Sequence, residues 1–88
     1  MFVIVVYDAQ VERVAKLHKI CKKYLTWVQR SVFEGEISRA DFERMSYELK
    51  EAIDEQQDSI LIYKFRTKKY YERQSIGAQT PSSEDFIF

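Results

Sequence analysis

Residues 2–7 read FVIVVY and are followed directly by Asp8. A continuous run of β-branched and other apolar residues is typical of a central strand that is covered on both faces. The run therefore predicts that the sheet is built around residues 2–7, with Asp8 at the point where the chain leaves it.

The periodicity changes after this strand. Apolar or small side chains recur every three or four residues from Val11 to Leu25, with the lysines mostly between them, which predicts an amphipathic helix with a basic outer face. Residues 26–34 alternate and predict one half-exposed strand. Gly35 is then expected to make a tight turn into a short return strand at residues 36–37.

The second half of the chain repeats the pattern of helix and strand. Ser38 with Asp41 three residues later resembles a helix start, and Phe42, Met45, Leu49 and Ile53 line one face of the expected helix. Residues 59–65 (SILIYKF) predict another long strand. The resulting order β-α-β-β-α-β indicates an α+β fold of the ferredoxin-like type.

The length and composition favour one small domain. An 88-residue chain buries only a modest core, and 45% hydrophobic content is rich for so small a domain. Dimerisation is therefore a plausible way to extend the core. We expect residues 1–66 to form the ferredoxin-like domain. We expect residues 67–88 to form a C-terminal tail, whose late apolar end (residues 86–88) is expected to add a strand to a partner subunit.

The single cysteine, Cys21, cannot form an intrachain disulfide, which argues against a secreted disulfide scaffold. The run at residues 2–7 is too short to span a membrane and lacks the flanking features of a targeting segment. We therefore expect a cytoplasmic protein without membrane association.

The net charge is zero, but the charges are segregated. Residues 10–30 carry six basic side chains against one acid, whereas residues 31–60 carry nine acids against three basic side chains. The basic stretch is interpreted either as a solvated helix face or as a surface that meets nucleic-acid phosphates. On the second interpretation the candidate contacts are Arg13, Lys16, Lys19, Lys22, Lys23 and Arg30.

Asp8 is the sharpest candidate for chemistry. One interpretation is that its carboxylate caps the following helix. The other is that it binds Mg²⁺, which takes one or two protein carboxylates and retains several waters. One aspartate per chain is a sparse site, so metal binding predicts two copies of Asp8 facing each other across a two-fold axis. His18 and Cys21 lack the further ligands that zinc would require.

Three segments together resemble one known family. They are VVYDA at 5–9, VQRSVFEGEIS at 28–38 and DSILIYKF at 58–65, and in this order and spacing they resemble the CRISPR-associated protein two family, the small endoribonuclease-type subunit of CRISPR spacer acquisition. The resemblance covers nearly the whole chain.

The resemblance implies a homodimer whose tail strands pair with the opposite subunit. It implies that the dimer bridges a CRISPR-associated integrase and holds the DNA fragment that becomes a spacer. It also implies metal-dependent cleavage of single-stranded RNA or double-stranded DNA, with Asp8 as the magnesium ligand and Tyr7, Ser31 and Phe33 as further catalytic candidates. Residues 25–27 (LTW) depart from the family pattern, because Trp27 stands where a basic residue is usual; Arg13 and Arg30 are candidates to compensate.

Two other functions fit the same architecture. One is a free-standing ribonuclease toxin that uses the same aspartate. The other is a non-enzymatic ferredoxin-like regulatory module that binds a small ligand at its dimer interface; the segregated basic stretches argue mildly against it, since a small ligand needs no long track of positive charge.

Overall fold

The structure is a computed structural model, and it describes residues 1–78. The predicted order of elements is confirmed. The elements are β1 (Phe2–Asp8), α1 (Val11–Tyr24), β2 (Thr26–Gln29), β3 (Val32–Glu36), α2 (Arg39–Ala52), β4 (Ser59–Phe65) and the short 3₁₀ helix η1 (Lys68–Tyr70).

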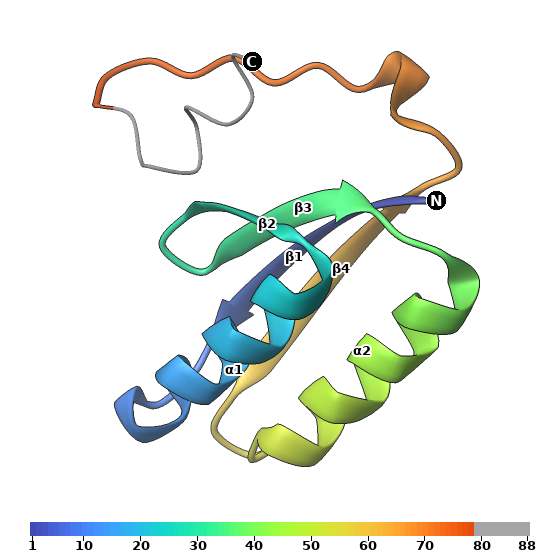
Figure 1. The fold of residues 1–88 in the computed structure, drawn as a ribbon. Coiled ribbons are helices and arrows are strands. Elements are labelled where there is room, and N and C mark those ends of the chain that lie inside the picture. The colour runs from blue at the N-terminus through green and yellow to red at the C-terminus, as the bar shows by residue number, and fades with distance from the viewer. Residues whose placement is uncertain (79–88) are drawn as a thin grey trace.

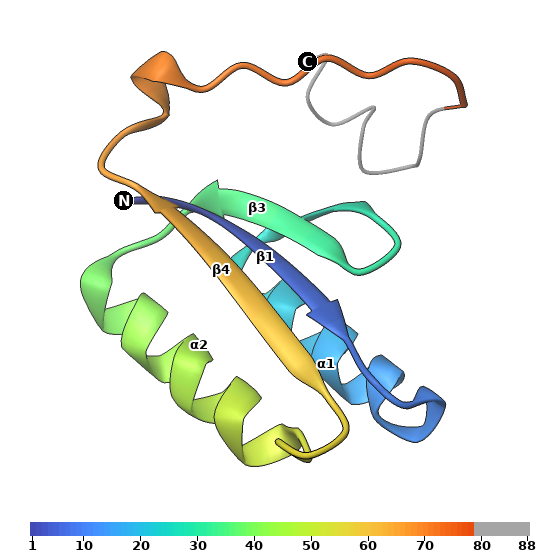
Figure 2. The ribbon, with the colours of Figure 1, turned by 180° about the vertical axis from the view of Figure 1, so that it is seen from behind.

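The four strands form one antiparallel sheet in the order β2-β3-β1-β4, so β1 is an inner strand as predicted. Both helices cover the same face of this sheet (Figures 1 and 2). The opposite face, which we call the open face, is visible in Figure 2. The expectation that β1 is covered on both faces is therefore wrong for the single chain as far as residues 1–78 go, because no helix among them packs on the open face.

The core lies between the sheet and the helices. Since alternate residues of a strand point to opposite faces, Val3, Val5 and Tyr7 of β1 all point toward the helices. They pack with buried residues from both helices and the hairpin, which include Leu17, Cys21, Phe33, Met45 and Leu49. The same alternation places Ile4, Val6 and Asp8 on the open face.

The predicted course of residues 26–37 is wrong in one respect. The turn of the hairpin falls at residues 30–31, where Arg30 has a positive φ of 44°, and Gly35 lies inside β3 opposite Val3. A Cβ at Gly35 would come within 3.3 Å of the Leu25 side chain. This glycine therefore lies where β3 packs closely against Leu25, and it does not form a turn.

The two long helices begin differently. The hydroxyl of Ser38 accepts a hydrogen bond from the Asp41 N–H at 3.1 Å, so the predicted start of α2 is confirmed. The N-cap of α1 is Gln10, whose side chain makes no capping hydrogen bond. Asp8 lies two residues earlier, as the last residue of β1, so the capping interpretation of Asp8 is wrong.

Residues 67–78, which we call the C-terminal arm, follow β4 and run back along the β2–β3 side of the sheet (Figures 1 and 2). The Tyr71 ring packs on Phe2 and Phe65 with centroid distances of 4.8 and 5.9 Å. The predicted partner-pairing strand at residues 86–88 lies outside the described residues. Within residues 1–78, no helix has the length and apolar character needed to cross a membrane.

Candidate nucleic-acid and metal site

Asp8 stands exposed at the end of β1. Its register partner across the sheet is Ser59, the first residue of β4. Since Asp8, Val6 and Ile4 alternate with the buried residues of β1, the Asp8 carboxylate emerges on the open face of the sheet. The carboxylate is thus both solvent-accessible and carried by a rigid central strand.

A shallow hollow of about 410 Å³ lies beside this strand end. It is lined by Tyr7, Asp8, Ala9, Val14, Arg30 and Ser31. The Tyr7 N–H donates a hydrogen bond to the Ser31 carbonyl at 3.2 Å, which joins the end of β1 to the hairpin turn. The structure therefore brings together Asp8, Ser31, Arg30 and part of Tyr7, four residues that were predicted as site residues.

Phe33 is not part of this surface. Its ring is fully buried, and it stacks on Tyr7 with a centroid distance of 6.3 Å. Tyr7 itself is only 4% exposed, and burial, with the nearby Cys21 thiol as a smaller cause, raises the pKa of its phenol above the ordinary value. Both rings thus belong to the packed core, and the Tyr7 phenol stays protonated at neutral pH.

The donor groups at the hollow fit magnesium better than zinc. A carboxylate and a hydroxyl are hard oxygen donors, which Mg²⁺ prefers. Within residues 1–78, no three His, Cys, Asp or Glu side chains are grouped to hold a metal. Cys21 is buried, which raises the pKa of its thiol to about 12, and the His18 ring packs on Trp27 and Phe33. Asp8 gives one carboxylate per chain, the lower end of the one or two that Mg²⁺ takes, and a second copy would supply another.

The predicted phosphate-binding side chains divide into two groups. Lys16, Lys19 and Lys22 are exposed on the outer side of α1, and Arg30 is exposed at the hairpin turn. Lys23 forms an ion pair with Glu48 of α2, and Arg13 forms an ion pair with the buried carboxylate of Asp58. The first group is available to bind phosphate, whereas each member of the second already pairs with a carboxylate of the same chain.

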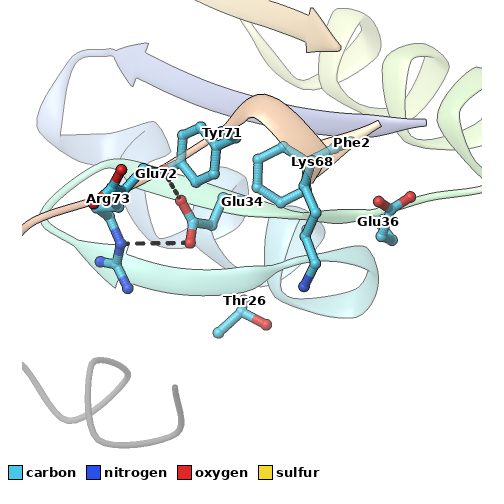
Figure 3. A pocket seen from close by; sticks show the side chains of 9 residues that line it. Phe2, Thr26, Glu34, Glu36, Lys68, Tyr71, Glu72 and Arg73 are labelled. Carbon is cyan, nitrogen blue, oxygen red and sulfur yellow. Dashed lines mark hydrogen bonds and ion pairs between the residues drawn. The ribbon is translucent and has the colours of Figure 1, made fainter. Parts of the chain in front are cut away.

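Sequence reasoning missed two buried carboxylates. Asp58 was visible only as the residue before a predicted strand. Glu34 lies on the open face beneath the arm, where the Tyr71 hydroxyl donates to it at 2.7 Å and the Arg73 guanidinium pairs with it at 3.6 Å (Figure 3). These side chains line a second hollow of about 620 Å³, at the end of the sheet away from Asp8.

Comparison with known proteins identifies the family. The sequence model of the family described as CRISPR associated protein Cas2 matches residues 1–73. A relative from Pyrococcus furiosus named CRISPR-associated endoribonuclease Cas2 is 46% identical over 87 residues, which cover 99% of this chain and 100% of the relative.

Solved structures agree with this match. One described as the crystal structure of cas2 has a TM-score of 0.85 at 46% identity and covers 92% of this chain and 91% of its own. The structure of Streptococcus pyogenes Cas2 at pH 6.5 has a TM-score of 0.77 at 32% identity, covering 88% of this chain and 100% of its own. The fold, the match over residues 1–73 and the identity to whole relatives agree, and the chain belongs to the CRISPR-associated Cas2 family.

Proposed function

We propose that this chain acts as a homodimeric, magnesium-dependent endonuclease of CRISPR spacer acquisition. The observation that carries the proposal is the position of Asp8, exposed on the open face at the end of the central strand of a Cas2 fold. The name of the Pyrococcus furiosus relative, an endoribonuclease, supports phosphodiester hydrolysis as the reaction.

The open face supports the dimer. It carries an apolar patch, defined by Ile4, Val6, Val32, Leu61, Tyr63 and Phe65. Leu61 and Tyr63 are 56% and 53% exposed, although both belong to the sheet. A contiguous exposed apolar surface of this kind is typical of an interaction site, and closed two-fold dimers are the commonest homo-oligomers.

A second copy on this patch also completes the site. Asp8 and the apolar patch lie on the same face, and the two-fold relation that covers the patch of one chain covers the same patch of the other. The two Asp8 carboxylates can then approach each other and provide the pair of oxygen ligands that a single chain lacks. The proposal therefore joins the dimer and the metal site through one surface.

When bound, magnesium would stabilise negative charge on the scissile phosphate and favour ionisation of an attacking water. Asp8 of each chain would hold the ion. Arg30 lines the same hollow, and a guanidinium is suited to bind a phosphate beside the scissile one. Tyr7 and Phe33 keep their places in the core and hold the strand end and the hairpin turn in register.

Binding and cleavage draw on different residues. Lys16, Lys19 and Lys22 lie along a 14-residue helix, which is about 21 Å long, so α1 presents several charges to a nucleic-acid backbone. We further propose that this surface holds duplex DNA while the dimer bridges the CRISPR-associated integrase. This scaffolding role needs shape and positive charge but not the metal.

The decisive experiment compares the wild-type chain with Asp8→Asn on single-stranded RNA and on duplex DNA, in magnesium and in EDTA. We expect the variant and EDTA each to abolish cleavage, while duplex binding remains and weakens with salt in both proteins. Glu43→Gln, at an exposed position of α2, is the matched control. Cleavage that survives Asp8→Asn or EDTA would refute the catalytic part of the proposal.

A further inference from the structure

We propose that Asp58 and Arg13 form a clasp that positions the Asp8 turn, so that Arg13 is a positioning residue and not a phosphate contact. The functional half of this inference, which concerns the metal held by Asp8, rests on the proposed function. The structural half does not.

The Asp58 carboxylate is the most densely bonded acidic group of the described chain. Its side chain is 0% exposed, and each of its two oxygens accepts two hydrogen bonds. Oδ1 accepts from the Gln10 N–H at 2.9 Å and from Arg13 Nη2 at 3.0 Å. Oδ2 accepts from the Asp54 N–H at 2.9 Å and from Arg13 Nε. A buried carboxylate with this many donors is rigidly held.

The clasp joins the segment that follows Asp8 to the strand that lies beside it. Along the sequence, Gln10 lies two residues after Asp8, and its N–H is held by Asp58. Across the sheet, the register partner of Asp8 is Ser59, which directly follows Asp58. The Asp58 carboxylate thus ties the segment after Asp8 to the strand beside it. Only Ala9 lies between Asp8, which pairs with β4, and Gln10, which donates to Asp58.

Arg13 is committed to this clasp by its geometry. Two of its nitrogens meet the two Asp58 oxygens in the paired arrangement that suits a guanidinium, and its third meets Glu12 at 3.4 Å. The Arg13 side chain is 20% exposed, whereas Lys16, Lys19 and Lys22 of the same helix are exposed to solvent. A phosphate would have to displace a buried carboxylate to reach it.

The first test is the salt dependence of duplex binding. A side chain that contacts phosphate contributes about 0.9 to the slope of log affinity against log salt concentration. We expect Arg13→Gln to leave this slope unchanged and Lys16→Gln, on the exposed side of α1, to lower it. A slope that falls by about one unit in Arg13→Gln would overturn the assignment.

The second test measures positioning directly. Asp58→Ala removes all four hydrogen bonds. Glu48→Ala is the control, because Glu48 also accepts hydrogen bonds from side chains of α1, those of Lys23 and Tyr24, but lies away from Asp8. In amide hydrogen exchange, we expect the Gln10 N–H, which donates to Asp58 Oδ1, to exchange at least about tenfold faster in Asp58→Ala and at the wild-type rate in Glu48→Ala. If Asp58→Ala does not fold, Arg13→Gln, which removes two of the four bonds, takes its place.

Calorimetric titration with magnesium then separates the two halves. We expect Asp58→Ala to bind magnesium at least about tenfold more weakly than Glu48→Ala, at a temperature where both are folded. Equal affinities with equal exchange rates would overturn the clasp. If the wild-type chain binds no magnesium, the proposed metal site fails, while the exchange comparison still decides whether the clasp positions the turn.

Discussion

Substitution of Phe33 by leucine separates packing from catalysis at a residue that the family resemblance links to the active site. Phe33 is fully buried, with the His18 ring at 5.0 Å and the Tyr7 ring at 6.3 Å between centroids. A hydrophobic swap of this kind costs about 1 kcal/mol in packing, and losing an aromatic contact costs about 0.5–1.5 kcal/mol more. We therefore expect Phe33→Leu to lower the free energy of unfolding by about 2 kcal/mol. For a chain of this size that corresponds to a fall in Tm of about 8–16 °C.

The assay is thermal unfolding followed by cleavage of single-stranded RNA at a temperature where every variant is folded. Leu49→Ala is the control, because Leu49 is 2% exposed in the same core but belongs to α2, away from the hollow. Both variants should lose stability and retain cleavage within about threefold of the wild-type rate. The reasoning is refuted if Phe33→Leu keeps its Tm but loses cleavage, since the ring would then act on the substrate and not in the core.

Three other outcomes follow from named contacts. Tyr71→Phe removes the hydroxyl that donates to buried Glu34, so chemical unfolding should show a loss of about 1–2 kcal/mol, whereas Tyr70→Phe, at an 86% exposed ring, should show none. Hydrogen bonds from Arg13 hold the pKa of the Asp58 carboxyl well below its usual range. The free energy of unfolding should therefore keep the full Asp58 contribution above about pH 5 and lose it progressively as the pH falls. If Asp58→Asn loses stability with falling pH as steeply as the wild-type chain, this prediction is wrong. Leu61→Lys, at a 56% exposed position of the apolar patch, should shift the dimer toward monomer in analytical ultracentrifugation, and an unchanged mass would exclude this face as the interface.

Much of the fold was predictable because the strongest patterns coincide with the best-buried elements. Residues 2–7 and 59–65 became β1 and β4, and the Ser38 cap began α2 as expected. The hairpin was misplaced because glycine is the usual signal for a turn. Here Gly35 lies inside β3 in close contact with Leu25, while Arg30 adopts the positive φ of the actual turn.

The candidate site was predictable only in part. The position of Asp8 follows from the apolar run that precedes it, because the residue that ends such a run lies at the end of a strand. The engagement of Arg13 does not follow, because its partner Asp58 is 45 residues away and looks like any other acid in an acidic stretch. Glu34 likewise lies in an alternating strand, and only the folded arm reveals that Tyr71 and Arg73 cover it.

The account depends on two copies of Asp8 that share one divalent ion across the open face. A crystal structure of the dimer grown with Mn²⁺ tests this directly, because the anomalous signal locates the ion independently of the protein atoms. We predict one peak between the two Asp8 carboxylates, absent from crystals of Asp8→Asn. The account would be contradicted by two Asp8 carboxylates more than about 10 Å apart with no peak between them. One ion cannot bridge that gap, because direct metal–oxygen bonds are roughly 2.0–2.6 Å long.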